Sequence, residues 1–328
     1  MQNPTINRIG DNFNWWFGVV EDLEDPLKLG RVRVRVYSHH TEDRNKVPIK
    51  DLPWAQVVLP PTSASINDIG HDGTGLLKGS WVIGFWIDSV DQQPMILGSL
   101  NGIPQQIAKD IKGIGFNDPE GKYPGRAHEP DTNRLARNDK DFPPPNPDAR
   151  NKDQTKFVPL ANGVLLANSQ PMWDEPNAKY NATYPKNHVF QSESGHIMEI
   201  DDTKDSERIH EYHKSGTHYE IDAKGNKQTR VVANNYTIVY GEDYVNIKGS
   251  CHLTIDTNCT TYIKGNWDIQ VDGNVNEHIK GTLTQTVEKQ VTEHYNSNQT
   301  TNINSVLDVN ATSLIDMDAP RIDLNKDR

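Results

Sequence analysis

A glycine recurs at a fixed spacing of eight residues in the C-terminal third of the sequence. Counted in steps of eight, the stations that carry glycine are Gly225, Gly241, Gly249, Gly265, Gly273 and Gly281. With only 23 glycines among 328 residues, chance does not easily produce this spacing. Self-similarity at a fixed period indicates a repeat architecture, so this octad restricts the possible folds more than any other feature of the chain.

An apolar and usually β-branched side chain stands two residues before each station. The central members of this row are Val239, Ile247, Ile255, Ile263, Val271, Ile279 and Val287. Other odd-numbered positions are often apolar too, whereas even-numbered positions are mostly polar. Because strand side chains alternate between two faces, we expect odd residues to point inward and even residues to point outward.

Glycine inside a strand pattern usually marks a bend or a close backbone approach. A bend every eight residues makes a strand zigzag around an axis, and one chain with so thin an apolar row cannot enclose a core. Several chains wound together can, if their β-branched rows meet on the axis. The octad is also too short for one turn of a single-chain β-helix, which takes roughly twenty residues. The sequence therefore predicts an intertwined β-helical prism built by an oligomer.

The N-terminal part has a different pattern. Residues 31–37, "RVRVRVY", alternate perfectly, and turn signals separate about five short strands between residues 14 and 102. This number of strands suits a compact OB-like barrel, so the expected fold class is all-β. We expect an OB-fold collar domain at 1–102, an extended Pro-rich connector at 103–187, a β-rich lead-in at 188–224 and the octad needle at 225–328.

The composition excludes some classes of protein. The net charge is −11 with both signs mixed, which argues against a general nucleic-acid binder. No stretch approaches about 18 consecutive apolar residues, so we expect no spanning helix. The mean hydropathy of −0.75 fits either partial disorder or a shape with little core per residue.

Two sets of residues could in principle bind a metal. Cys251 and Cys259 lie one octad apart, as stacked thiols for a metal or redox site would, but small apolar core residues in adjacent layers explain them better. Two groups of histidines are the other candidates, and we interpret most of them as surface residues: His210, His213 and His218 near the lead-in, and His252, His278 and His294 at even needle positions. The prediction is no metal site and no cofactor.

Two N-terminal features could contact nucleic acid or phosphate. Arg31, Arg33 and Arg35 form a basic stripe on one strand face, but no aromatic residues alternate with them for base stacking. A solvated face, or contact with an acidic partner subunit, is the favoured interpretation. The loop "GHDGTG" at 70–75 lacks the G-K-[ST] ending of a phosphate loop, and a flexible hairpin loop is favoured.

The octad units "VYGEDYVN", "IKGSCHLT", "IKGNWDIQ" and "IKGTLTQT" resemble the triple-stranded β-helix of contractile-tail spike proteins. The strands "GRVRVRV", "LPWAQVVLP" and "GSWVIGFWIDSVDQQPMILGSL" resemble the OB-fold of the T-even-type baseplate spike. The resemblance implies a homotrimer in the baseplate of a phage tail that punctures the host envelope and crosses the outer membrane. It also implies a trimeric hub at the OB-fold end and a small tip protein of the proline-alanine-alanine-arginine class at the other end.

One departure from that family concerns catalysis. The T-even spike carries a lysozyme domain between barrel and needle, and residues 103–185 are too few and too Pro-rich for it. The available carboxylates are Glu120, Glu129, Asp131 and Asp141, with no apolar pocket visible around them. We therefore expect no catalytic residues. The alternatives are a type VI-like secretion spike, a spike with residual peptidoglycan-hydrolase activity in 103–187, and a receptor-binding fibre.

Overall fold

The computed structural model describes residues 14–67, 69–102, 130–138, 158–159 and 172–322. Within them the chain is all-β, as the sequence predicts, and its one helical element is the 3-10 turn η1 (Ile49–Asp51). The chain divides into two units, one with residues 1–161 and 170–259, the other with residues 162–169 and 260–328. Each is described by itself.

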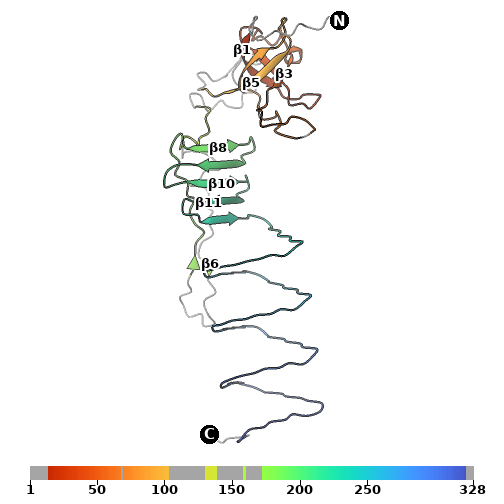
Figure 1. The fold of residues 1–328 in the computed structure, drawn as a ribbon, viewed down its shortest axis with the longest axis vertical. Coiled ribbons are helices and arrows are strands. Elements are labelled where there is room, and N and C mark those ends of the chain that lie inside the picture. The colour runs from red at the N-terminus through yellow and green to blue at the C-terminus, as the bar shows by residue number, and fades with distance from the viewer. Residues whose placement is uncertain (1–13, 68, 103–129, 139–157, 160–171, 323–328) are drawn as a thin grey trace. The chain divides into compact units, whose positions relative to one another are not determined.

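A closed barrel of five strands occupies the N-terminal part of the first unit (Figure 1). Its strands are β1 (Trp15–Asp22), β2 (Val32–Val36), β3 (Trp54–Val57), β4 (Trp81–Trp86) and β5 (Pro94–Leu100). They follow the order β1-β2-β3-β5-β4, and β4 closes the barrel on β1 with Trp15 opposite Phe85. The five strands expected between residues 14 and 102 are all present, which confirms the OB-like barrel.

The barrel core forms because one residue in two of each strand points inward. Val32, Val34 and Val36 alternate with the arginines of β2 and are almost fully buried. Two tryptophans, Trp16 and Trp86, belong to the same core, with ring centroids 6.0 Å apart. A buried aromatic pair of this kind contributes more than its area alone, so this pair anchors the barrel.

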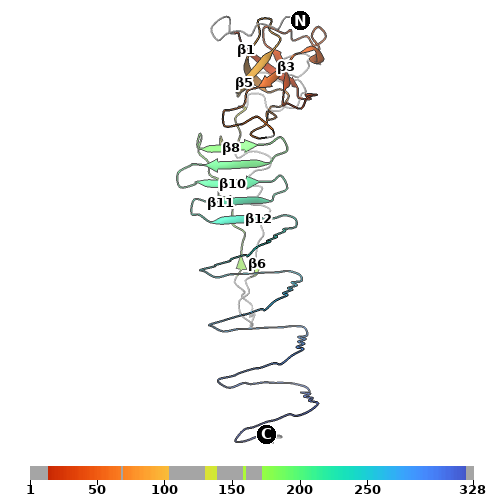
Figure 2. The same cartoon turned by 45° about the vertical axis from the view of Figure 1, so that its right-hand side comes forward.

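A second sheet follows in the chain. It is an antiparallel meander of β8 (Asn187–Gln191), β9 (Ile197–Asp201), β10 (Arg208–Tyr212), β11 (His218–Ile221) and β12 (Lys227–Arg230). Figure 2 shows the same five strands stacked one after another. Outside these sheets, the described residues contain only a short pair, β6 (Val158–Pro159) with β7 (Met172–Trp173).

The sheet extends into the segment in which the octad count begins. Gly225 has a φ of +80° and lies in the tight turn between β11 and β12, where its N–H donates to Asp222 O at 2.8 Å. A left-handed φ favours glycine, so this residue serves a hairpin turn. β12 therefore lies within the segment 225–328 that the sequence assigns to the needle, and it pairs with β11 in this sheet. Most of the connector expected at 103–187 lies outside the described residues.

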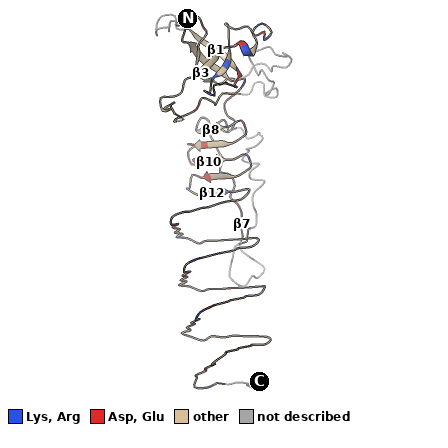
Figure 3. Cartoon of the chain, turned by 90° about the vertical axis from the view of Figure 1, so that its right-hand side faces the viewer, with Lys and Arg blue, Asp and Glu red and all other residues tan. Residues whose placement is uncertain are grey.

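Past β12 the chain changes character. Between Val231 and Ile322, all described, no strand pairs with another, and the trace doubles back repeatedly (Figures 1 and 2). Charged residues of both signs lie on the strands before it (Figure 3). Among the described residues no helix is long and apolar enough to cross a membrane.

Candidate functional site

The octad segment, residues 231–322, bends at regular intervals. Each bend covers two residues and the bends recur every eight, at 232–233, 240–241, 248–249, 256–257, 264–265, 272–273, 280–281, 288–289, 296–297, 304–305 and 312–313. Gly241, Gly249, Gly265, Gly273 and Gly281 each stand second in such a pair. The chain also bends at the stations without glycine. The eight-residue period is therefore a property of the backbone, and it does not require glycine at every station.

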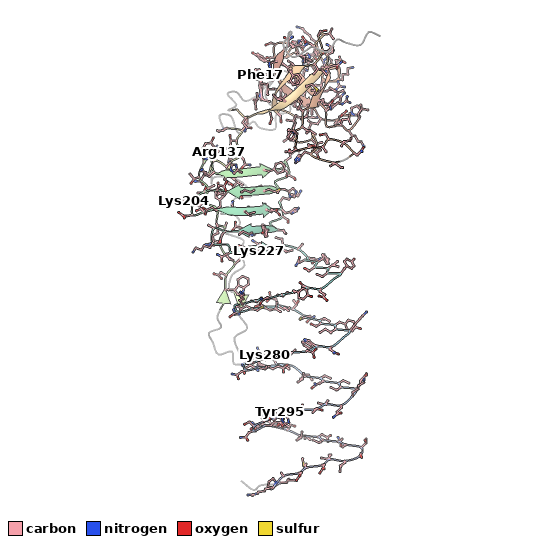
Figure 4. The ribbon with its side chains drawn as sticks, in the orientation of Figure 1. Phe17, Arg137, Lys204, Lys227, Lys280 and Tyr295 are labelled. Atoms are coloured by element: carbon pink, nitrogen blue, oxygen red, sulfur yellow. The ribbon has the colours of Figure 1, made fainter. Side chains whose placement is uncertain are left out.

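The β-branched row lies close to these bends but is not buried. Its members Val239, Ile247, Ile255, Ile263, Val271, Ile279 and Val287 are between 43% and 54% exposed. The apolar residues between the rows, such as Val245 and Leu253, are about three-quarters exposed. Figure 4 labels Lys280 and Tyr295, whose side chains project from the same thin trace. A single chain therefore leaves an unbroken series of apolar side chains facing solvent.

Within one chain, the structure keeps the needle cysteines and histidines apart from the histidines of the β8–β12 sheet. Cys251 and Cys259 are free and exposed, and the part of the chain that the structure describes holds no group of three metal-ligating side chains. His252, His278 and His294 are exposed as well. The three histidines near the lead-in differ in exposure. His213 lies in the exposed β10–β11 turn, whereas His210 and His218 are buried.

The β8–β12 sheet buries several ionisable side chains on one face. Glu199, Arg208, His210 and Glu220 are each at most 6% exposed and contact one another. Residues 172–187 contribute to the cover of this face, where the Tyr180 ring lies 5.3 Å from the Arg208 guanidinium. Reasoning from sequence missed this network. Its signal is the alternation in "MEID", "RIHEY" and "HYEI", which places a charged or histidine side chain at every second position of three successive strands.

The opposite face of the same sheet is open and carries large apolar side chains, with the exposed Glu211 opposite Met198 among them. Ile200, Ile209 and Ile221 stand opposite one another across β9, β10 and β11. Phe190 and Met198 form a second pair on this face. Of these, Phe190, Met198, Ile200 and Ile209 are 47–67% exposed. The usual distribution of polar and apolar residues is thus reversed in this sheet.

The basic stripe of β2 is not available to a partner, which corrects the sequence interpretation. Arg35 is fully buried and its guanidinium donates twice to Glu21 at 2.9 Å. Arg31 pairs with Asp25 at 2.6 Å, and this contact holds the pKa of Asp25 well below its ordinary value. Arg33 donates to the carbonyls of η1 and lies over the Trp54 ring at 4.5 Å. The stripe therefore serves to hold the loops of the barrel in place.

The other N-terminal candidates are also structural where they are described. In the 70–75 loop, Thr74 donates its hydroxyl to Asp72 at 2.7 Å, which forms a local turn. Of the four candidate carboxylates, Glu120, Glu129 and Asp141 lie outside the described residues. Asp131 accepts the Gly102 N–H at 2.9 Å, so it stabilises the chain after β5.

Comparison with known proteins agrees with the barrel. Residues 35–177 match the family described as the Gp5 N-terminal OB domain. The chain is 38% identical over 254 residues to Protein Gp5 of Vibrio phage KVP40, covering 69% of this chain and 59% of the relative. It is 42% identical over 135 residues to the pre-baseplate central spike protein Gp5 of Enterobacteria phage T4.

In sequence the chain is similar to T4-like central spike proteins. The T4 match covers 40% of this chain and 23% of the T4 protein. The chain therefore spans less than two thirds of the length of either curated relative. The T4 relative is named for a place in the phage baseplate and not for a reaction.

Proposed function

We propose that this chain is the structural central spike of a contractile-tail baseplate in the virion and works as a homotrimer. The observation that carries the proposal is the octad segment, which bends every eight residues and leaves its β-branched row about half exposed in a single chain. A soluble protein rarely leaves so long an apolar series facing water, so other chains cover it.

Further copies of the same chain are the partners that can cover this apolar row. The row repeats with a period of eight residues over the whole segment, and only a partner with the same period contacts every member of it. Identical chains related by a closed rotation satisfy this condition, and three chains can place their rows around one axis. Backbone groups that lack strand partners within one chain then pair between chains, which removes exposed sheet edges.

The reversed sheet supports the same assembly. Its buried face is charged, and the isoleucine ladder of β9, β10 and β11 faces outward. Packing the ladders of three copies together encloses an apolar core at the start of the needle. In this proposal, copies of the same chain cover both the isoleucine ladder of the sheet and the β-branched row of the octad segment.

The barrel supports docking on a trimeric hub. Trp15 and Phe17 on β1 are 54% and 49% exposed, and Trp15 packs edge-on against Phe85 of β4 at 5.9 Å. Figure 4 labels Phe17 on the barrel. Aromatic side chains on an outer sheet face are typical of protein interfaces. We assign this face to the hub, and the far end of the needle to a small tip protein of the proline-alanine-alanine-arginine class.

The role that follows is mechanical. A needle held by bonds between three chains transmits the thrust of sheath contraction through the host envelope, including the outer membrane, because extracting one chain breaks many bonds together. The chain is not an enzyme in this account. Zymography on peptidoglycan with purified protein tests that part: we expect no clearing, and clearing at the level of a lysozyme control contradicts it.

Cysteine accessibility tests the assembly. In one chain Cys251 and Cys259 are exposed, and in the trimer they face inward with the other odd residues. We expect both to react with maleimide at least tenfold more slowly in native protein than in denaturant. The matched control is Asn258→Cys in a variant with both native cysteines replaced by serine, because position 258 is even and faces outward. Native reaction of Cys251 and Cys259 as fast as that of the control rejects the proposal.

A further inference from the structure

A row of ionisable side chains crosses the buried face of the β8–β12 sheet. Glu199 on β9, His210 on β10 and Glu220 on β11 stand directly opposite one another. Their exposed fractions are 2%, 6% and 2%. The imidazole of His210 therefore lies between two carboxylates, away from bulk water.

Hydrogen bonds fix the protonation state of Glu199. Its carboxylate accepts from Asn187 Nδ2 at 3.1 Å, from His210 Nδ1 at 2.8 Å and from the Arg208 guanidinium. Three donors on one carboxyl group stabilise its ionised form. Burial raises the pKa of Glu199, but the hydrogen bond from His210 and the charges of Arg208 and His210 outweigh burial and lower that pKa below its ordinary value.

The charges of this cluster balance only with a further proton. Arg208 also donates to Glu220 at 3.1 Å, so one guanidinium faces two carboxylates. An uncompensated charge in a buried site is costly. Glu199 and Glu220 are held as hydrogen-bond acceptors by Arg208, which leaves the imidazole of His210 as the group in the row that can carry a positive charge.

The surrounding groups do not remove this imbalance. Asp201, opposite Arg208 on β9, is a further buried carboxyl group, and its Oδ1 accepts the Thr203 N–H at 2.9 Å. On β11, His218 Nδ1 lies 3.0 Å from the Gly216 carbonyl, which accepts from it, and its ring centroid is 5.9 Å from that of His210. Tyr212 and Tyr180 are the ring neighbours of His210 and Arg208. From the covering segment, Lys179 offers its backbone N–H to Glu220, and Glu175 pairs with Arg230 at 3.7 Å.

We propose that His210 is a proton-binding site and is protonated in the folded sheet. The Glu199–His210–Glu220 row then makes the stability of this sheet, which precedes the octad segment in the chain, depend on pH. The network lies within one chain, so the inference does not depend on the proposed trimer. A histidine that holds its proton more tightly when folded stabilises the fold fully below about pH 6.5, the unfolded value. That stabilisation is lost as the pH rises through the higher folded-state value.

Hydrogen–deuterium exchange at the histidine C2 position, followed by mass spectrometry of the full-length protein between pH 5 and 10, tests the inference on the unaltered chain. We expect the exchange midpoint of His210 at least one pH unit above that of the exposed His71 in the same digest. One unit is a tenfold difference in proton affinity. A midpoint at or below that of His71 overturns the proposal.

Two variants separate the row from a general effect of burial. E220Q removes one negative charge without changing the size of the side chain, so the His210 midpoint falls towards that of His71. An unchanged midpoint in E220Q contradicts the assigned role of the carboxylates. H210Q removes the loss of thermal stability that we expect above neutral pH, whereas H71Q keeps it. If H210Q does not fold, the titration of the unaltered protein still decides.

Discussion

The barrel and the octad segment are both built from alternating apolar and polar residues, yet only the barrel encloses a core within one chain. In the barrel, Val19, Val20 and Val82 are completely buried. In the octad segment the least exposed members of the β-branched row are 43% exposed. Alternation predicts which side chains share a face, but closure of the sheet on itself determines whether that face is covered by the same chain.

The glycines of the two regions differ in the same way. A methyl group added at Gly84 of the barrel would lie 2.1 Å from the Met95 carbonyl oxygen and 2.3 Å from the Trp16 ring. At Gly241, Gly265 and Gly273 an added methyl group would meet no described atom within 4 Å. The barrel requires glycine for a contact that one chain supplies, whereas one chain supplies no such contact at these octad glycines, and in the proposed trimer other chains would approach them.

The largest effect is expected from a charge in the β-branched row. Ile279→Asp places three carboxylates near the axis of the trimer, and each uncompensated charge costs about 3–5 kcal/mol. We expect loss of the trimer, read as solution mass. The matched control is Lys280→Asp at the adjacent outward position, which should change stability by no more than about 0.5 kcal/mol. Equal behaviour of the two variants would show that odd and even positions are equivalent and would remove the distinction between the faces.

The next largest effect belongs to the buried ion pair of the barrel. Glu21→Gln leaves Arg35, fully buried, without its carboxylate, and breaking such a pair costs about 3–5 kcal/mol in one chain. Chemical denaturation followed by tryptophan fluorescence measures it, because five of the seven tryptophans belong to barrel strands. Lys46→Met is the control, since Lys46 makes an exposed contact to Asp43 at 3.8 Å. A loss in Glu21→Gln no larger than in the control would contradict the account of the barrel.

A smaller effect is expected from the glycine contact. Gly84→Ala forces the added methyl group against Met95 and Trp16, which costs about 1–3 kcal/mol. Gly98→Ala, where an added methyl group meets nothing within 4 Å, serves as the control in the same barrel. Chemical denaturation measures both variants. A Gly98→Ala variant less stable than Gly84→Ala would contradict the importance of the close contact at Gly84.

The last effect concerns acidic pH. Burial, together with the charges of His39 and Arg35, lowers the pKa of His40 from 6.5 to about 4. Its Nδ1 accepts the Val36 N–H at 2.9 Å, which requires an unprotonated nitrogen. The unfolded chain therefore binds a proton between pH 6.5 and 4 that the folded barrel does not, and barrel stability falls over that range. His40→Gln should reduce the fall in melting temperature between pH 6.5 and 4, whereas His71→Gln should leave that fall unchanged. A fall in His40→Gln as large as in the unaltered protein would show that other groups cause it.

The parts of the fold that could be predicted from sequence are those where local pattern and packing agree. "RVRVRV" places three valines on one face, and those valines belong to the barrel core. The octad spacing likewise coincides with the backbone bends. In both cases a period in the sequence is a period in the structure, and no distant residue is needed to interpret it.

The remaining features depend on what lies against each face. The arginines of β2 look like an open stripe, but the loop that follows β2 covers Arg35, and sequence spacing does not encode that cover. Gly225 fits the octad count, yet the pairing of β11 with β12 uses it for a turn. The charged row of Glu199, His210 and Glu220 has a visible alternation, but only the covering segment identifies that face as the buried one.

The most direct test of the central claim is the solution mass of the full-length protein by multi-angle light scattering. The account predicts a mass near three times 37.0 kDa that does not fall on dilution, because the octad rows are covered only by copies of the chain. A monodisperse, stable species of 37.0 kDa would contradict it, since the apolar row would then face water in the native protein.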